Sequence, residues 1–136
     1  AAVRHRALPA LARALGADPV PALARSAAAA ADDDEALASW AQRVRASETR
    51  GQGGARSIRV KALEGLPRAV RGRVLASFLR DAGVPGGSLA AGHVEAVDAL
   101  VTAWRGQGPL SLPRVVVARS GRGERAVIEA GPLRSQ

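Results

Sequence analysis

The chain has 136 residues, the size of one domain or of one small domain plus a piece of a neighbour, and 47% of them are hydrophobic. It has no cysteine, which excludes disulfides and thiolate metal sites, and no apolar run approaches the roughly 20 residues that cross a bilayer. No basic segment followed by an apolar one opens the sequence, so we expect a cytoplasmic protein without a membrane partner. The formal net charge is +8, and every basic residue except Lys61 is arginine.

The first third of the chain is predicted to be helical. Leucines at positions 8, 11 and 15 share one helix face, and this helix is expected to begin near Leu8, after extended residues, because Pro9 suits only a first turn. Residues 16–19 indicate a turn, and a long helix is predicted over residues 20–47. Four acidic residues, 32–35, point in different directions on that helix, so we interpret them as a solvated face or an internal restart of the helix and not as a metal site.

A glycine-rich segment, residues 48–57, has no apolar periodicity and is predicted to be flexible, with a domain boundary at 51–57. Residues 58–63 then alternate apolar and basic side chains, which predicts a short strand with a positive, solvent-facing side. We expect this strand to open a second domain that extends from residue 58 to residue 136.

A core helix is predicted over residues 66–80, because apolar side chains recur there every fourth residue. Pro67 suits its first turn, and Gly83 is suited to the position just after its end. Ser88 is predicted to cap the next helix, whose inward residues run as far as Trp104.

The C-terminal part is rich in β-branched residues, in three segments at 110–113, 114–119 and 125–130. The last two are joined by a glycine-containing loop, which predicts an antiparallel hairpin, and the strand at 58–63 is placed to pair with it. The predicted fold class is therefore mainly α, a helical bundle with a small C-terminal antiparallel β-hairpin or sheet, that is, α+β.

The positive charge is concentrated in residues 43–80, which hold ten basic and two acidic residues and so carry a charge equal to that of the whole chain. The ten are Arg43, Arg45, Arg50, Arg56, Arg59, Lys61, Arg68, Arg71, Arg73 and Arg80. A compositional preference for arginine explains its use in place of lysine, but it does not explain this clustering. A basic segment of this kind favours a polyanionic partner, and guanidinium groups match phosphate geometry.

Residue types that carry out catalysis are scarce. The two histidines, His5 and His93, have no neighbouring nucleophile or paired carboxylate in the predicted elements, and no glycine-rich phosphate-binding motif follows a predicted strand. We predict no catalytic residue, no metal site and no cofactor site within this chain.

Two groups of short motifs follow one another along the chain. Arg4 and Arg6 precede L-P-A-L at 8–11, and A-R-S-A at 24–27 is followed by acidic residues at 32–34. Residues 63–75, LEGLPRAVRGRVL, then fit the pattern L-x-x-L-P-x-x-[LV]-R-x-R-x-L. The order and spacing of these motifs resemble those of bacterial tRNA(Ile)-lysidine synthases, over nearly the whole chain.

The resemblance implies an ATP-dependent ligase that adenylates the wobble cytidine of a CAU-anticodon tRNA(Ile), after which the amine of lysine displaces AMP. It implies that ATP, Mg²⁺ and the co-substrate L-lysine bind to an N-terminal ATP-pyrophosphatase domain with an S-G-G-x-D-S loop, which this sequence lacks. Residues 1–50 would then be the last helices of that domain with a connecting helix, and 58–136 the tRNA-binding domain. The implied partners are tRNA(Ile) and the ATP-pyrophosphatase domain of the same protein, with Arg4 and Arg6 near the nucleotide-binding half.

The side chains expected to contact tRNA phosphates are Arg68, Arg71 and Arg73, and with them Arg80, Arg59, Lys61, Arg43 and Arg45. Because the chain has only three aromatic residues, we expect recognition of shape and backbone and not base stacking. Two alternatives stay open. One is a helical protein-interaction or dimerisation module, a homodimer included, and the other is a generic nucleic-acid-binding domain such as a DNA-binding regulator.

Overall fold

The chain divides into two compact units, Ala1–Ala36 and Leu37–Gln136, in a computed structural model that describes residues 1–133. Its elements are helices and one five-stranded antiparallel sheet, so the predicted α+β class is confirmed. Within residues 1–133, no helix combines the length and the apolar character that crossing a membrane requires.

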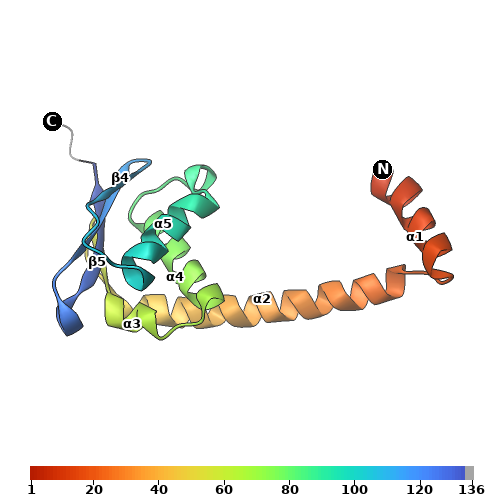
Figure 1. The fold of residues 1–136 in the computed structure, drawn as a ribbon, viewed down its shortest axis with the longest axis horizontal. Coiled ribbons are helices and arrows are strands. Elements are labelled where there is room, and N and C mark those ends of the chain that lie inside the picture. Colours follow the sequence, from red (N-terminus) through yellow and green to blue (C-terminus); the bar gives the residue numbers. More distant parts are fainter. Residues whose placement is uncertain (134–136) are drawn as a thin grey trace. The chain divides into compact units, whose positions relative to one another are not determined.

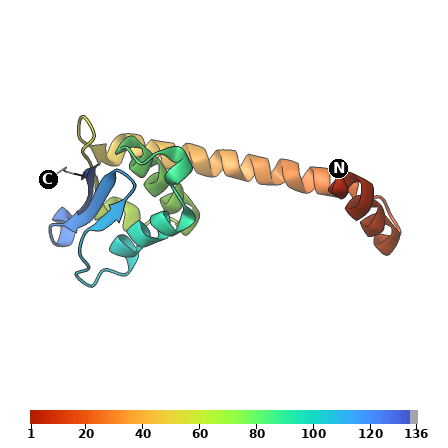
Figure 2. The same cartoon turned by 90° about the horizontal axis from the view of Figure 1, so that it is seen from above.

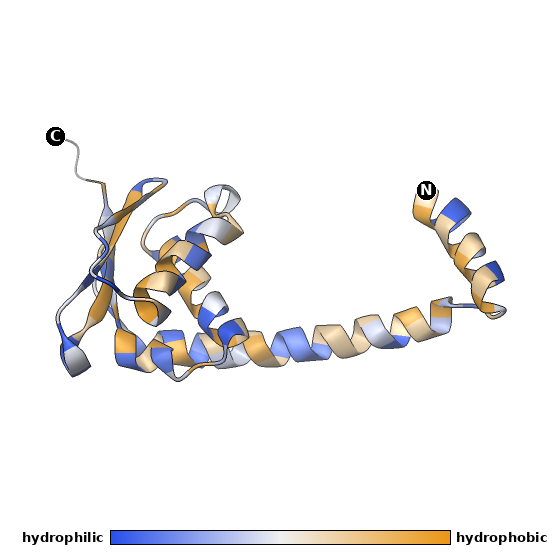
Figure 3. Ribbon diagram, in the orientation of Figure 1, coloured by the Kyte–Doolittle hydropathy of each residue, from blue (hydrophilic) through white to orange (hydrophobic). Residues whose placement is uncertain are grey.

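The first unit consists of α1, Leu8–Leu15, and the first part of α2, Val20–Glu48. The prediction of extended residues before Leu8 is wrong, because Val3–Ala7 form a π-helical turn that runs into α1. The wider turn suits Pro9, whose ring would clash with the carbonyl group four residues earlier in a regular helix. Apart from Pro19, every aliphatic side chain of this unit is at least partly exposed, and Figure 3 shows hydrophobic and hydrophilic residues side by side on α1.

The second unit contains all the strands and the remaining helices. In chain order these are β1 Thr49–Arg50, β2 Arg56–Arg59, α3 Val60–Glu64, α4 Arg68–Asp81, α5 Ala91–Thr102, β3 Leu110–Leu112, β4 Val115–Ser120 and β5 Val127–Pro132, with short 3-10 helices at Gly86–Ser88 and Gly123–Arg125. The strand order in the sheet is β1-β2-β5-β4-β3, and every neighbouring pair is antiparallel. Figure 1 shows α4 and α5 together on one face of this sheet.

The pairing of β2 with β5 confirms that the strand near residue 58 joins the C-terminal hairpin. Ile58 lies opposite Ile128 in the ladder, and Val117 of β4 lies opposite Ala130 on the other side of β5. All four side chains are buried, because alternate residues of each strand face the helices.

The predicted strand over 58–63 is shorter than expected, since β2 ends at Arg59 and α3 begins at Val60. The Val60 N–H donates to the carbonyl oxygen of Ala126 at 2.9 Å, which is the last bond to the C-terminal segment before the chain turns. Val60 and Leu63 are both fully buried, and their spacing of three suits one face of a helical turn better than a strand.

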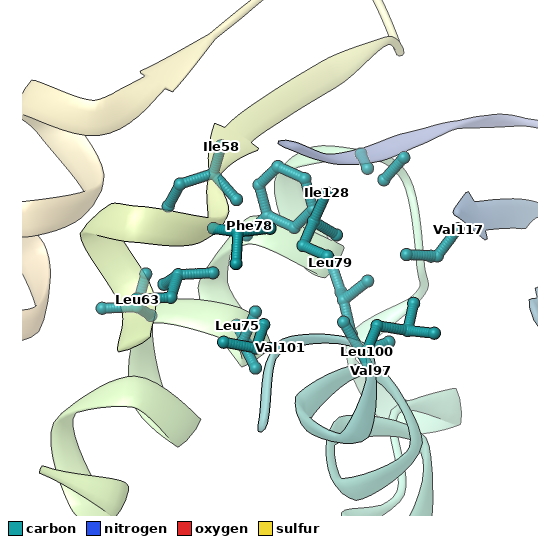
Figure 4. Packing of buried hydrophobic residues seen from close by; sticks show 14 of the residues in the cluster. Ile58, Leu63, Leu75, Phe78, Leu79, Val97, Leu100, Val101, Val117 and Ile128 are labelled. Carbon is teal, nitrogen blue, oxygen red and sulfur yellow. The ribbon is translucent and has the colours of Figure 1, made fainter. Parts of the chain in front are cut away.

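The hydrophobic core lies between the sheet and the two helices. Phe78 and Leu79 of α4 are fully buried beside Ile58 and Ile128 of the sheet and Leu100 of α5 (Figure 4). The helix predicted over residues 66–80 is therefore confirmed as the central core element. It ends in a Schellman motif, with Gly83 at φ +113° and the Val84 N–H donating to the Leu79 carbonyl at 3.0 Å.

Helix α5 differs from its prediction at both ends. It begins at Ala91, and the residue that precedes it, Ala90, donates its N–H to Nδ1 of His93 at 3.1 Å, so His93 caps the helix. The helix ends at Thr102, and Trp104 therefore lies outside it with 40% of its surface exposed instead of facing the core.

The glycine-rich segment forms the turn of a hairpin between β1 and β2, which Figure 2 shows as a projecting yellow loop. Gly51 has φ +126°, and a Cβ atom placed on it would lie 2.3 Å from the carbonyl oxygen of Ala55. The backbone of this segment is therefore fixed by the ladder on both sides of the turn. A domain boundary at 51–57 stays a prediction, as do domains at 1–50 and 58–136.

Candidate nucleic-acid interface

One face of α4 is turned away from the core and carries three arginines separated by small residues. We call it the α4 outer face and define it by Arg68, Ala69, Gly72, Arg73, Ala76 and Arg80. Positions 68, 72, 76 and 80 follow one another at the four-residue spacing that places side chains along one side of a helix. Because the residues between the arginines are small, the surface between the guanidinium groups is flat and open.

Three shallow hollows adjoin one another across this face. A hollow of about 530 Å³ lies directly over α4 and is lined by Arg68, Gly72 and Arg73, among others. A groove of about 380 Å³ separates α4 from α5 and shares Arg68 and Gly72 with that hollow. A third, of about 270 Å³, lies between α4 and residues 38–45 of α2 and includes Arg73 and Arg80. The arginines thus lie where a long ligand crossing α4 would contact the protein.

Arg68 and Arg80 are both exposed, and neither forms a hydrogen bond or ion pair with the part of the chain that the structure describes. Arg73 is partly buried, and its Nη1 donates to the Ala69 carbonyl at 3.0 Å, which holds the side chain along the helix. These guanidinium groups give the α4 outer face its positive charge.

Gly72 occupies the middle of this face and of the helix. A glycine inside a helix lowers the stability of the protein by about 0.5–1 kcal/mol relative to alanine, because glycine loses more backbone freedom on folding. A Cβ atom built at Gly72 would have no neighbouring atom within 4 Å, so the packing of the chain does not require a glycine there.

Arg71 does not lie on the α4 outer face, and the structure therefore differs from the expectation that it contacts phosphate. Its side chain is buried, with a relative exposure of 9% for the residue. The guanidinium donates to both carboxylate oxygens of Asp98 in α5, at 2.5 and 3.3 Å, and to the carbonyl of Leu66 at 2.8 Å. This side chain joins α4 to α5 and has no face left for a ligand.

Three other basic residues from the predicted set form ion pairs. Arg45 pairs with Asp81, Arg59 with Glu48 at 2.7 Å, and Lys61 with Glu124 at 3.3 Å. Asp81, Asp98 and Glu124 all lie outside residues 43–80, so the sequence count overestimates the free positive charge of that segment. Arg43 instead donates to the hydroxyl oxygen of Ser39 at 2.9 Å.

Arg4 and Arg6 lie in the π-helical turn of the first unit, and both are exposed. Neither takes part in the α4 outer face, which belongs to the second unit. His5 is exposed between them, and among residues 1–133 no three histidine or carboxylate side chains gather as they would around a metal ion.

Two features of the structure were not predicted. One is the open glycine between the arginines, although the four-residue spacing of Arg68, Gly72, Ala76 and Arg80 is visible in the sequence. The other is the Trp104 ring, which lies 5.1 Å from the guanidinium carbon of Arg119. Arg119 also donates to the Leu100 carbonyl at 2.8 Å, so it ties β4 to the end of α5.

Known proteins identify the part of the chain that carries this face. Residues 59–123 match the family model described as the TilS substrate binding domain. This stretch of the chain is therefore similar to a TilS substrate-binding domain. Its bounds enclose α4 and α5, with Arg59, Lys61, Arg68, Arg71, Arg73 and Arg80, and leave Arg4, Arg6, Arg43 and Arg45 outside.

The chain is homologous to tRNA(Ile)-lysidine synthases over most of its length. It is 47% identical to the synthase of Streptomyces coelicolor over 129 residues, which cover 95% of this chain and 36% of that protein. The identity to the synthase of Thermobifida fusca is 46% over 120 residues, 88% of this chain and 35% of the relative. The chain thus spans about a third of the length of these curated relatives. No solved structure matches it significantly.

Within the matched residues 59–123, the α4 outer face brings the exposed side chains of Arg68 and Arg80 next to open hollows. The buried Arg71–Asp98 pair lies in the same domain and holds together the two helices that frame the groove. The domain therefore contains a rigid scaffold and a positively charged surface on adjacent sides of one helix.

Proposed function

We propose that this chain is the tRNA-recognition part of an ATP-dependent tRNA(Ile)-lysidine synthase. In this proposal the α4 outer face binds the sugar–phosphate backbone of tRNA(Ile), while the ligation of lysine to the wobble cytidine takes place elsewhere in the protein. The observation that carries the proposal is the exposure of Arg68 and Arg80, without an acidic partner among residues 1–133, inside a substrate-binding domain.

The chemistry of this face suits a phosphate backbone. Guanidinium groups form paired hydrogen bonds with phosphate oxygens, and such contacts position a nucleic acid without reading its sequence. Arg68, Arg73 and Arg80 are our first candidates, followed by Arg43 on the neighbouring helix. Arg71 is left out because its guanidinium is already engaged with Asp98 and Leu66.

Arg45, Arg59 and Lys61 are proposed as secondary contacts. The Arg59 side chain keeps 58% of its surface exposed and that of Lys61 62%, even though both are paired. Exposed ion pairs contribute little to folding stability, so a phosphate group can replace the carboxylate partner at small cost.

We also propose that the first unit lies against the ATP-pyrophosphatase domain of the same protein, with Arg4 and Arg6 near the nucleotide-binding half. Leu11 and Leu15 of α1 are 39% and 63% exposed, and Val3 in the preceding turn is 67% exposed, so these apolar side chains are not covered within this unit. ATP, Mg²⁺ and L-lysine are then substrates and ligands of that other domain.

Salt dependence tests the phosphate contacts. Displacement of counterions from about four phosphates gives a log–log slope of affinity against salt of roughly −3 to −4. We expect Arg68→Ala and Arg80→Ala each to weaken binding of tRNA(Ile) and to reduce the slope by about 1, in fluorescence-anisotropy titrations at several salt concentrations.

The matched control is Arg122→Ala, which removes an exposed arginine from the loop between β4 and β5 and is expected to leave binding unchanged. A salt-independent affinity, or Arg68 and Arg80 variants that bind like the parent chain, would contradict the proposal. Competition by duplex DNA as strong as that by tRNA favours the generic nucleic-acid-binding alternative. Self-association in size-exclusion chromatography, with no retention of RNA, favours the dimerisation module.

A further inference from the structure

The glycine at position 72 has no explanation within the chain. Its backbone is ordinary helix, its φ is not positive, and an added Cβ would enter open space. Alanine at this position would favour the helix and clash with nothing. Glycine is nevertheless the residue used wherever another backbone must approach closely.

The residues around Gly72 indicate which kind of molecule approaches it closely. It lines both the hollow over α4 and the groove between α4 and α5, and Arg68 lines the same two surfaces. Arg73 follows Gly72 directly and lines the hollow from the other side. The groove also holds the acidic side chains of Glu95 and Asp98, so a polyanion is favoured on the side of the hollow. A polyanionic chain that contacts both Arg68 and Arg73 there would pass over Gly72.

We propose that Gly72 is the point of closest approach between α4 and the sugar–phosphate backbone of the bound tRNA. Because glycine has no side chain, the nucleic acid can approach the helix closely at this position. The arginines on either side then reach phosphates at hydrogen-bonding distance. This inference rests on the proposed function, because it takes the α4 outer face as the tRNA-binding surface. Two independent observations support it, namely the unpaired charge of Arg68 and Arg80 and the match of this helix to a substrate-binding domain.

The decisive experiment separates folding from binding at this position. Gly72→Ala is expected to raise the melting temperature of the 136-residue chain by a few degrees, because alanine is the better helix former. The same substitution is expected to weaken binding of tRNA(Ile) by about tenfold, as insertion of a methyl group into a close-packed contact does. Gly72→Gln, which has a longer side chain that is also compatible with a helix, should weaken binding further.

Gly92→Ala is the matched control. Gly92 lies in the first turn of α5, is exposed, and also has nothing within 4 Å of an added Cβ, but it does not line the groove. We expect that variant to keep the parent affinity for tRNA.

Each outcome decides one question. An affinity that Gly72→Ala leaves unchanged, while Arg68→Ala weakens binding, overturns the role of Gly72 and leaves the proposed function standing. A lower melting temperature of Gly72→Ala also overturns the inference, because the glycine would then serve the fold. Unchanged affinity in both Arg68→Ala and Arg80→Ala overturns the proposed function itself.

Discussion

The Arg71 guanidinium makes three hydrogen bonds within the chain, two to the Asp98 carboxylate and one to the Leu66 carbonyl. Arg68, one helical turn earlier on α4, makes none with the described residues. Both are arginines of one helix, but the first is an internal support and the second is a solvent-facing cation. Mutation of Arg71 is therefore expected to affect folding stability, and mutation of Arg68 is expected to affect binding.

We expect Arg71→Ala to lower the free energy of unfolding by about 1–3 kcal/mol, since it leaves the partly buried Asp98 carboxylate without its partner. Arg68→Ala should change that free energy by less than about 0.5 kcal/mol, as substitutions at exposed, unpaired positions do. Urea denaturation followed by circular dichroism measures both. An Arg71→Ala chain that keeps its stability but loses tRNA binding would show that Arg71 contacts the ligand after all.

The sequence alone predicts that Arg71 is buried, but it does not predict the partner of Arg71. Positions 71, 75 and 78 are spaced as on one helix face, and Leu75 and Phe78 are core residues, so the burial of Arg71 follows from helical geometry. Its partner does not, because Asp98 is 27 residues away and meets Arg71 only once α5 packs on α4. For the same reason, the pairing of Lys61 with Glu124 could not be predicted from the sequence. A sequence can therefore predict a basic surface, but pairing across elements decides which of its charges are free.

At the level of elements, the segment that was least well predicted is the one around the β1–β2 turn. Glycines and the lack of apolar periodicity predict a flexible segment. Here, however, the glycines form a turn whose backbone is held in place. The ladder from Arg50 to Ser57 and from Arg56 to Ala130 fixes both ends of the turn. Helices 20–47 and 66–80 were predicted well because their apolar spacing is long and regular, whereas the boundary between β2 and α3 depends on a hydrogen bond to distant Ala126.

Substitution of Gly51 tests whether this turn is structured. Gly51→Ala should lower the free energy of unfolding by more than about 1 kcal/mol, because the residue has φ +126° and its Cβ would meet the Ala55 carbonyl. Gly54→Ala is the control, since the nearest atom to a Cβ there is a side-chain carbon of Pro132 at 3.5 Å. Equal melting temperatures for both variants and the parent would indicate a flexible link instead.

For the whole molecule, the division into two units places the buried hydrophobic side chains in the second one. The cluster begins at Ala41 and ends at Ala130, and no hydrophobic residue of Ala1–Ala36 belongs to it. The candidate tRNA-binding surface lies in the same unit. Folding and recognition are therefore both expected to survive without the first unit.

A chain that begins at Leu37 is expected to unfold cooperatively and to bind tRNA(Ile) within about twofold of the parent affinity, because it keeps the core and the α4 outer face. Differential scanning calorimetry and anisotropy titration measure the two properties. A loss of cooperative unfolding would show that residues 1–36 support the fold. A large loss of affinity in a folded fragment would place essential tRNA contacts in the first unit.

The pairing of β2 with β5 has a consequence for the order of synthesis. Helices α3, α4 and α5 and strands β3 and β4 all lie between these two strands in the chain. One edge of β2 pairs with β1, and the other stays unpaired until β5 has left the ribosome. A message truncated before Val127 yields a chain in which both β2 and β4 have open edges, which invites aggregation. Removal of residues 1–10 leaves every strand of the described sheet paired. Strand β5 is thus the segment that this sheet cannot lose.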